Sequence, residues 1–363
     1  MRRFEHAAAG RQVAEAIVVR LELADGAVGW GETLPREYVT GETLESVPRD
    51  IEEFLWPAAL GGDETGKELP ATDPGGRAIT AACCAVSLAM YDASRHCFGG
   101  KTRPGSGPLP PFPAVRVSGV LGSADPARTA RRLRMMRLYG LRDFKLKLGF
   151  DDDVDAANLR VVDKRIGKAV RGGKCTLRVD VNGAWAESET PDRVAALRPY
   201  GVCVVEQPVF GPPEALIDLA GRCELPLMAD ESLITAADAD KLVQAPGKAI
   251  WLNVRLSKNG GIWHCLSIVE AAAGAEVPFT IGCMVGESSI LSAAQRQLLW
   301  RAGLPRFVEG NYGTFLLADD LTARSIRFGY GGKLKCPANA GLGVRVDPRK
   351  IARHGTLVKA LRA

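Results

Sequence analysis

Eight short apolar runs recur between residues 115 and 308, and most of them are separated by stretches of helical length and spacing. The runs are Val115–Val120, Phe144–Leu148, Thr176–Val181, Val202–Val205, Pro226–Met228, Ile250–Leu256, Phe279–Ile281 and Phe307–Val308. Strands that alternate with helices indicate βαβ units and a parallel sheet. Eight such strands favour closure into an α/β barrel of the TIM type, which takes roughly 200–250 residues.

The chain before these runs has a different texture. Residues 17–23 alternate between apolar and polar side chains, and Asp25-Gly26 marks a hairpin turn before a second strand at Ala27–Gly31. Helical spacing follows at Ile51–Leu55 and at Ile79–Tyr91. Strands followed by helices predict a small α+β domain in front of the barrel.

The clearest boundary is the segment 101–113, which is rich in Pro and Gly. We therefore expect an N-terminal α+β capping domain at residues 1–108 and a barrel at 109–325. A C-terminal segment at 326–363 is expected to pack back on the capping domain.

The charge pattern argues against nucleic acid or an anionic membrane as a partner. The chain has 47 basic and 42 acidic residues, a formal net charge of +5, and no block of like charges. Four arginines, Arg131, Arg132, Arg134 and Arg137, follow one another at helical spacing, which is typical of a solvated helix face.

Cysteine usage and hydropathy indicate a cytoplasmic protein. The nine cysteines are dispersed and none forms a CxxC pair, which favours reduced thiols over a disulfide framework or a thiolate metal site. The N-terminus lacks the apolar core of a signal peptide, and no stretch approaches the roughly 18–20 apolar residues of a membrane span.

Acidic residues stand where three successive apolar runs end. Asp180 closes the third run, Glu206 the fourth, and Asp230 follows the fifth. Catalytic groups of a barrel cluster at the C-terminal ends of its strands, so these acids should converge. Three carboxylates form a hard oxygen site that suits Mg²⁺ or Mn²⁺. The alternative for each acid by itself is a salt bridge or a helix cap.

Lysines inside apolar strands are unusual, because burying an ammonium group is costly unless it is paired or deprotonated. Lys145 and Lys147 are two positions apart, so they point to the same face of one strand, and one should lower the pKa of the other. Lys258 follows the sixth run and should face Lys147 across the barrel mouth. Two opposed bases could remove and return a proton α to a metal-bound carboxylate. The alternative is structural pairing of these lysines with the acids.

Five motifs resemble the enolase superfamily and, within it, the muconate lactonizing enzyme subgroup. They are Phe-Lys-Leu-Lys-Leu-Gly (144–149), Arg-Val-Asp-Val-Asn-Gly-Ala-Trp (178–185), Val-Glu-Gln-Pro (205–208), Ala-Asp-Glu-Ser (229–232) and Ser-Lys-Asn-Gly-Gly (257–261). Gly29-Trp30-Gly31-Glu32 and Gly341-Leu342-Gly343-Val344 extend the resemblance to nearly the whole chain. It implies a modified (β/α)7β barrel with a capping domain, and commonly a homo-oligomer.

The resemblance also implies roles for individual residues. Asp180, Glu206 and Asp230 would hold the metal with Asn182 and Glu231 beside them, Lys147 and Lys258 would be the acid/base pair, and Lys145 an electrostatic helper. The capping domain would cover the barrel mouth with two lid segments, Phe4 to Arg11 and Thr33 to Gly41. Arg36, Tyr38 and Glu287 are the candidates for contacts with a small-molecule carboxylate substrate.

The segment after the eighth run bears on the reaction. Dipeptide epimerases of the family usually carry an acidic pair there, whereas this chain has Gly310-Asn311-Tyr312-Gly313. We therefore expect cycloisomerisation of the muconate type. N-acylamino acid racemisation, dipeptide epimerisation, o-succinylbenzoate synthesis and sugar-acid dehydration remain alternatives, as does a non-catalytic binding protein on the same fold.

Overall fold

The computed structural model describes residues 4–6, 9–11, 13–95, 112–335 and 340–363. Eight strands form one parallel sheet in the order β12-β11-β10-β9-β8-β7-β6-β5. They are β5 (Gly119–Leu121), β6 (Asp143–Lys147), β7 (Thr176–Asp180), β8 (Val202–Glu206), β9 (Leu227–Ala229), β10 (Ile250–Val254), β11 (Phe279–Ile281) and β12 (Phe307–Val308). Val117 pairs with Val308 in a parallel bridge, which joins the two edges and closes the barrel. The eight-stranded barrel predicted from the apolar runs is confirmed.

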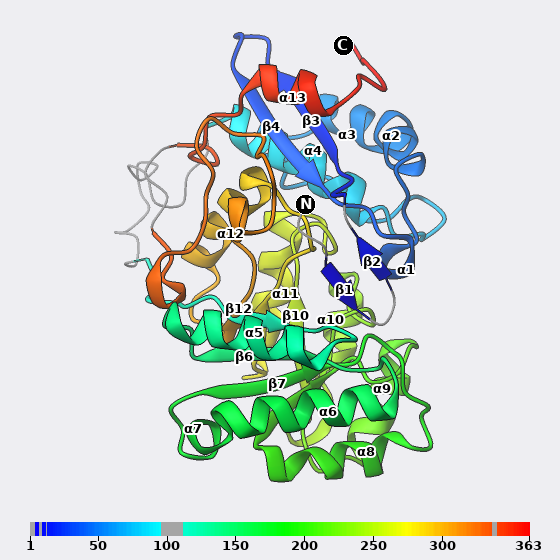
Figure 1. Cartoon of the computed structure of the whole chain (residues 1–363). Coiled ribbons are helices and arrows are strands. Elements are labelled where there is room, and N and C mark those ends of the chain that lie inside the picture. Colours follow the sequence, from blue (N-terminus) through cyan, green and yellow to red (C-terminus); the bar gives the residue numbers. More distant parts are fainter. Residues whose placement is uncertain (1–3, 7–8, 12, 96–111, 336–339) are drawn as a thin grey trace.

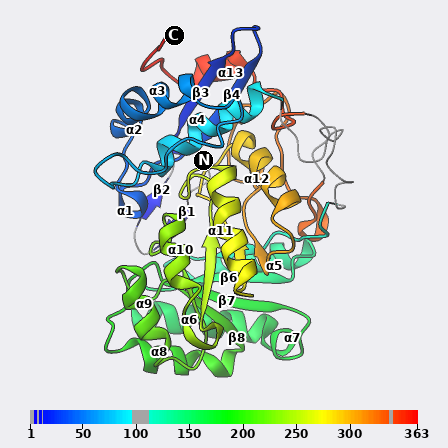
Figure 2. The ribbon, with the colours of Figure 1, turned by 180° about the vertical axis from the view of Figure 1, so that it is seen from behind.

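Helices connect successive strands and lie outside the barrel (Figures 1 and 2). They are α5 (Pro126–Leu138), α6 (Asp152–Val162) with α7 (Lys168–Arg171), α8 (Thr190–Leu197), α9 (Pro213–Ala220), α10 (Ala236–Leu242), α11 (Ile262–Gly274) and α12 (Ser289–Arg301). Seven connections are therefore helical, and β12 is followed by irregular chain and short 3-10 turns. This is the (β/α)7β arrangement that the resemblance implied.

The barrel strands are buried on both faces. Phe144 and Leu146 of β6 are fully buried on one side, and Lys145 and Lys147 of the same strand are buried on the other. Burial of the apolar side chains against the helices stabilises the barrel by about 1.5–3 kcal/mol for each large residue. The charged residues are therefore confined to the barrel interior, where they need partners.

The capping domain is an antiparallel hairpin packed on helices (Figure 1). It comprises β1 (Phe4–His6), β2 (Ala9–Arg11), β3 (Ile17–Glu22), β4 (Val28–Thr33), α1 (Glu37–Thr40), α2 (Ser46–Asp50), a π-helical turn (Ile51–Leu55), α3 (Trp56–Gly61) and α4 (Thr80–Ala93). Gly29 and Gly31 let β4 press against α4: a Cβ atom on Gly31 would lie 1.9 Å from the Ala85 carbonyl oxygen. This close approach explains the two glycines of the Gly29-Trp30-Gly31-Glu32 motif.

The C-terminal segment returns to the capping domain. Its helix α13 (Pro348–His354) lies near β3 and β4 at the top of Figure 1. The Leu342 amide donates to Asp92 at 2.9 Å, and Lys359 pairs with Glu52 at 2.7 Å. Through these contacts, residues of the C-terminal part of the chain reach the capping domain. The expected boundary at residue 108 lies outside the described residues.

Within the described ranges, no helix is both long and apolar enough to cross a membrane. The seven cysteines in those ranges are free thiols: Cys83, Cys84, Cys175, Cys203, Cys223, Cys265 and Cys283.

Candidate active site

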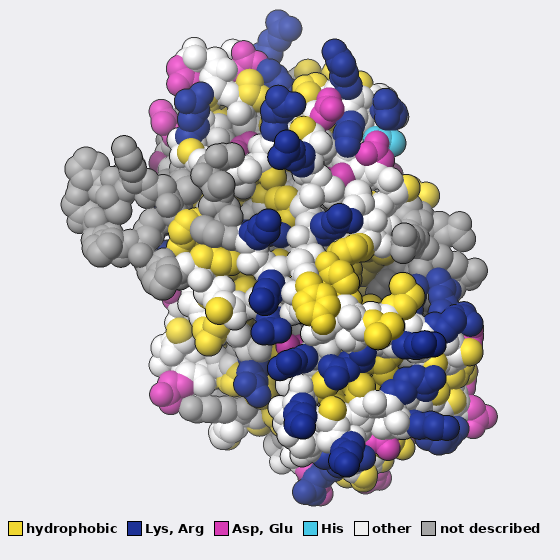
Figure 3. All heavy atoms as spheres, turned by 60° about the vertical axis from the view of Figure 1, so that its left-hand side comes forward, with side chains coloured by type: hydrophobic (Ala, Val, Ile, Leu, Met, Phe, Trp, Pro, Cys, Tyr) yellow, Lys and Arg dark blue, Asp and Glu magenta, His cyan; other side chains and the backbone are white. Residues whose placement is uncertain are grey.

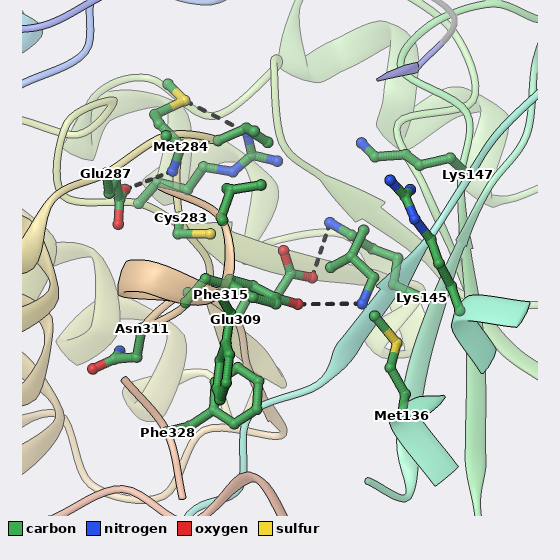
Figure 4. A pocket seen from close by; sticks show the side chains of 18 of the residues that line it. Met136, Lys145, Lys147, Cys283, Met284, Glu287, Glu309, Asn311, Phe315 and Phe328 are labelled. Atoms are coloured by element: carbon green, nitrogen blue, oxygen red, sulfur yellow. Dashed lines mark hydrogen bonds and ion pairs between the residues drawn. The ribbon is translucent and has the colours of Figure 1, made fainter. Parts of the chain in front are cut away.

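A cavity of about 340 Å³ opens at the C-terminal ends of the barrel strands. Lys145 and Lys147 lie on one side of it, and Cys283, Met284 and Glu287 lie on the other (Figure 4). Met135, Met136, Tyr139, Phe315, Leu316 and Phe328 supply an apolar wall. The cavity thus joins a charged region to an apolar one, as is typical of small-molecule sites.

Three fully buried carboxylates lie at the ends of neighbouring strands. Asp180 is the last residue of β7, Glu206 the last of β8, and Asp230 follows β9 directly. Asp180 and Glu206 are register partners in the sheet. The sequence-based expectation that these acids converge is therefore met in the fold.

Lys145 lies among carboxylates rather than against another cation. Its Nζ is 3.1 Å from both Asp180 and Glu206 and 2.9 Å from Glu309. Burial opposes the charge, but Glu206, Glu309 and Asp180 outweigh it and raise the pKa of Lys145. The expectation that one lysine lowers the pKa of the other is not met at Lys145, because acids surround it.

Lys147 lines the cavity and is held by two groups. Its Nζ donates to Asp180 at 2.5 Å and to the Asn182 side-chain oxygen at 2.8 Å. Asn182 in turn donates to Glu231 at 3.1 Å. Burial opposes ionisation of Asp180, but Lys147 and Lys145 outweigh it and lower its pKa. Asn182 and Glu231 both line the cavity, next to Lys147.

Lys258 does not lie where the sequence analysis placed it. It is fully buried and does not line the cavity, whereas Arg255 does. The Lys258 Nζ donates to the backbone carbonyls of Asp230 and Asn253 at 2.6 and 2.8 Å, and to the Asp230 carboxylate at 3.0 Å. The reason for the difference is register: β10 ends at Val254, two residues before the end of the apolar run, so Arg255 takes the strand-end position.

Arg255 connects the acids from the far side of the barrel. Its Nη2 donates to Asp230 and, at 3.2 Å, to Glu206, and its Nη1 lies 3.8 Å from the Met284 sulfur. Burial opposes its charge, but Asp230 and Glu206 raise its pKa. The Arg255 Nε is buried without a hydrogen-bond partner. The position of Arg255 directly after a strand is the sequence signal that could have identified this residue.

The acids have the donor chemistry of a divalent-metal site. Within the described ranges, however, no three His, Cys, Asp or Glu side chains already stand together as a ready ligand set. The structure gives a reason, because Lys145 contacts both Asp180 and Glu206, and Arg255 contacts both Glu206 and Asp230. Three hard carboxylates from adjacent strands fit Mg²⁺ or Mn²⁺. Binding of such an ion would require Lys145 and Arg255 to give up their contacts with the acids.

The expected substrate contacts all line the cavity. Arg36 is buried and donates to the Pro35 carbonyl at 2.8 Å, while Tyr38 is 37% exposed at the mouth. Glu287 accepts the Met284 amide at 2.6 Å, and burial raises its pKa to about 8. Side chains of the other expected lid, Phe4 to Arg11, lie outside the described residues.

Glu309, the residue that follows β12, also lines the cavity. It accepts Arg178 at 2.5 Å and pairs with Lys145 at 2.9 Å. Burial alone would raise its pKa, but Lys145 and Arg178 lower it to about 2. Arg178 is fully buried in the middle of β7, and no local pattern pointed to that pairing across 131 residues.

Comparison with known proteins places this geometry in a family. Residues 127–350 match the model described as "Enolase C-terminal domain-like". L-Ala-D/L-Glu epimerase of Bacillus subtilis is 28% identical, over 91% of this chain and 89% of its own. Muconate cycloisomerase 1-2 of Acinetobacter lwoffii is 29% identical, over 93% of this chain and 87% of its own.

A solved structure shares the whole fold. N-succinyl Arg/Lys racemase from Bacillus cereus superposes with a TM-score of 0.83 at 24% identity, covering 98% of this chain and 94% of that one. The relatives named are isomerases, and the matched residues include the three strand-end acids and both cavity lysines. The chain belongs to the enolase superfamily, and its similarity to muconate cycloisomerases supports the muconate lactonizing enzyme subgroup within it.

Proposed function

We propose that this protein is an isomerase that removes a proton α to a carboxylate, and that it cycloisomerises an unsaturated dicarboxylate or catalyses the reverse reaction. The observation that carries the proposal is the placement of Lys147. It lines the cavity while its Nζ rests on Asp180, one of three buried strand-end acids. A base that could remove a proton and a negatively charged site that could hold a metal therefore lie next to each other at one end of the barrel.

Asp180, Glu206 and Asp230 would hold Mg²⁺ or Mn²⁺. When bound, such an ion supplies positive charge that stabilises the enediolate form of a carboxylate. The acids are fully buried, so their charge must be balanced by cations, which Lys145, Arg255 and Lys258 supply in the structure. Asn182 and Glu231 hold Lys147 in position beside these acids.

The chain's own side chains divide the remaining work. Lys147 would accept the α-proton at Nζ. Arg36 and Arg255 would attract the anionic groups of the substrate, since both line the cavity as permanent cations. The apolar wall of Met136, Phe315 and Phe328 would pack on the carbon skeleton and exclude water (Figure 4).

The surroundings of Glu309 favour a dianionic substrate over a zwitterionic dipeptide. An ammonium group in this cavity would need a carboxylate partner, because an unpaired buried charge is expensive. Glu309 is close enough, but Arg178 and Lys145 already neutralise it. In the loop that follows, Asn311 bonds Gln295 at 2.6 Å and Arg296 at 2.7 Å. Neither residue is left to hold an ammonium group.

Epimerisation or racemisation is the second candidate, because the Bacillus subtilis epimerase is as similar to this chain as the muconate cycloisomerase is. o-Succinylbenzoate synthesis and a non-catalytic binding role are less favoured, since no structural feature selects them. We further propose a cytoplasmic homo-oligomer with no nucleic-acid or membrane partner.

Two assays separate the candidates. The purified protein is incubated with Mg²⁺ and cis,cis-muconate, whose loss is followed by ultraviolet absorbance, and in parallel with a panel of L,L-dipeptides, whose α-proton exchange is followed by NMR. The proposal predicts loss of muconate and no exchange on dipeptides. Exchange on dipeptides without action on muconate would contradict the proposed substrate class.

A further inference from the structure

The two lysines that line the cavity come from the same strand. Lys145 and Lys147 both belong to β6, and they lie together on one side in Figure 4. Inversion at a carbon requires a proton to leave from one face and to return to the other, so groups on both sides must exchange protons. The far side of the cavity therefore decides whether the enzyme can invert its substrate.

Arg255 occupies the strand-end position on that far side. It lies on β10's C-terminal end, four strands around the ring from β6, and its Nη1 contacts Met284, which Figure 4 places opposite Lys147. A guanidinium group stays protonated in proteins and does not serve as a base. Arg255 lines the cavity, so its permanent charge can hold a bound anion instead.

The neighbouring lysine cannot take over this task from where it lies. An ammonium group has three protons to donate, and the Lys258 Nζ has three oxygen acceptors within 3.0 Å. It is 0% exposed and does not line the cavity. Lys258 thus ties the turn after β10 to Asp230 and has a structural role.

The remaining acidic groups do not replace a base there. Glu231 is linked through Asn182 to Lys147, so it belongs to the lysine side. Glu287 is on the far side, but its carboxyl is occupied by the Met284 amide, and burial favours its protonated form. Glu309 is already paired with Lys145 and Arg178, and burial raises the pKa of the Cys283 thiol, which keeps it protonated. Of these groups, Lys147 is therefore the one placed to take up a proton, and it lies on the β6 side of the cavity.

We propose that Arg255 makes this site one-sided: the enzyme removes and returns the α-proton on the face of Lys147 only, and Arg255 holds substrate anion on the other face. The inference rests on the proposed function. The α-proton passes to the Lys147 Nζ, the C–H electron pair passes into the carboxylate as an enediolate, and Nζ returns a proton to the same face. Racemisation and epimerisation are then excluded for the natural enzyme.

Stereochemistry in D₂O tests this directly. Muconolactone is a suitable probe, because the carbon next to its carboxylate carries two hydrogens that NMR distinguishes. N-succinyl-L-amino acids, which have a single chiral α-carbon, serve as a second probe. The wild-type enzyme with Mg²⁺ should exchange one of the two muconolactone hydrogens, and any exchange on the amino acid derivatives should retain configuration.

The variant Arg255→Lys places an amine on the far side, and we expect it to exchange the second muconolactone hydrogen at least tenfold faster than the wild type does. Arg301→Lys, on the exposed end of α12, is the matched control and should behave like the wild type. Exchange of both hydrogens, or inversion, by the wild-type enzyme would overturn the inference but leave the proposed function standing. Absence of exchange on every probe would overturn both.

Discussion

Asp180 shows how a single side chain gathers the charges of this site. It receives Lys147 at 2.5 Å and Lys145 at 3.1 Å, and the Asn182 amide donates to its other oxygen at 3.2 Å. A buried carboxylate with three donors is held rigidly, which is what both a metal ligand and an anchor for a base require.

Removing the charge of Asp180 should weaken metal binding. Asp180→Asn replaces one ligand oxygen by an amide group, and we expect Mg²⁺ affinity to fall by at least roughly tenfold, the loss typical of a disturbed metal site. Isothermal titration calorimetry measures this, with Asp192→Asn on the exposed side of α8 as the control. Equal Mg²⁺ affinity in the two variants would show that Asp180 is not a ligand.

At the scale of elements, β4 and α12 are joined by one buried acid. Glu32 accepts the Ser288 amide at 3.0 Å, the Ser288 hydroxyl at 2.6 Å and the Leu291 amide at 3.1 Å. The carboxyl therefore sits at the N-terminus of α12, where it links the capping domain to the barrel. Burial nevertheless raises its pKa to about 7.

This raised pKa makes a pH-dependent contribution to stability. A carboxyl whose pKa is higher in the folded state stabilises the fold below its unfolded pKa, and this stabilisation is lost as the pH rises through the folded value. Between pH 5 and pH 8, ionisation of Glu32 should lower the free energy of unfolding of the wild type by up to about 3 kcal/mol. Glu32→Gln cannot ionise, so its stability should fall less over this range.

Urea unfolding at several pH values measures the difference. Glu53→Gln, which changes an exposed acid in the capping domain, is the control and should follow the wild type. Parallel curves for the wild type and Glu32→Gln between pH 5 and 8 would contradict the assignment.

The elements differ in how well the sequence predicted them. Seven of the eight apolar runs end within one residue of a barrel strand's end in the structure, because strands buried on both faces read as continuous apolar runs. The run at 250–256 failed, since Leu256 is buried in the turn after β10 and prolongs the pattern. Because of that error of two residues, Lys258 rather than Arg255 was the residue expected at the barrel mouth.

Contacts between distant segments were beyond local patterns. Arg178 with Glu309 and Glu32 with Ser288 join residues 131 and 256 positions apart. The three acids were predictable because each follows a strand, and strand ends of a closed barrel share one rim. Which cations would lie between them depended on the side-chain packing that only the fold specifies.

At the scale of the whole molecule, exposed arginines stand on a helix that borders the cavity. Figure 3 shows a face on which Lys and Arg side chains outnumber acidic ones among apolar and uncharged surface. On α5, Arg131 and Arg134 are exposed, while Arg132 and Met135 of the same helix line the cavity. The solvated helix face expected from the sequence thus also borders the site, and Arg132 belongs to it.

This charge should speed the capture of an anionic substrate. Arg134→Glu should lower kcat/KM for a dicarboxylate by about two- to threefold at low salt, and the loss should shrink above 0.5 M salt, as charge steering predicts. Steady-state kinetics over a salt series measures it. The control Arg165→Glu reverses an exposed charge on the connection between α6 and α7. A loss that does not depend on salt would point to a structural cause.

In the proposed reaction, Lys147 removes a proton α to a carboxylate. The most direct measurement is deuterium incorporation from D₂O at the α-carbon of a carboxylate library that includes muconolactone, followed by NMR in the presence of Mg²⁺. The wild type and Lys164→Ala, which changes an exposed lysine, should exchange at equal rates on at least one member of the library. Lys147→Ala should be slower by roughly 10²–10⁴, the contribution of a positioned base. Exchange at the wild-type rate in a folded Lys147→Ala variant would contradict the account.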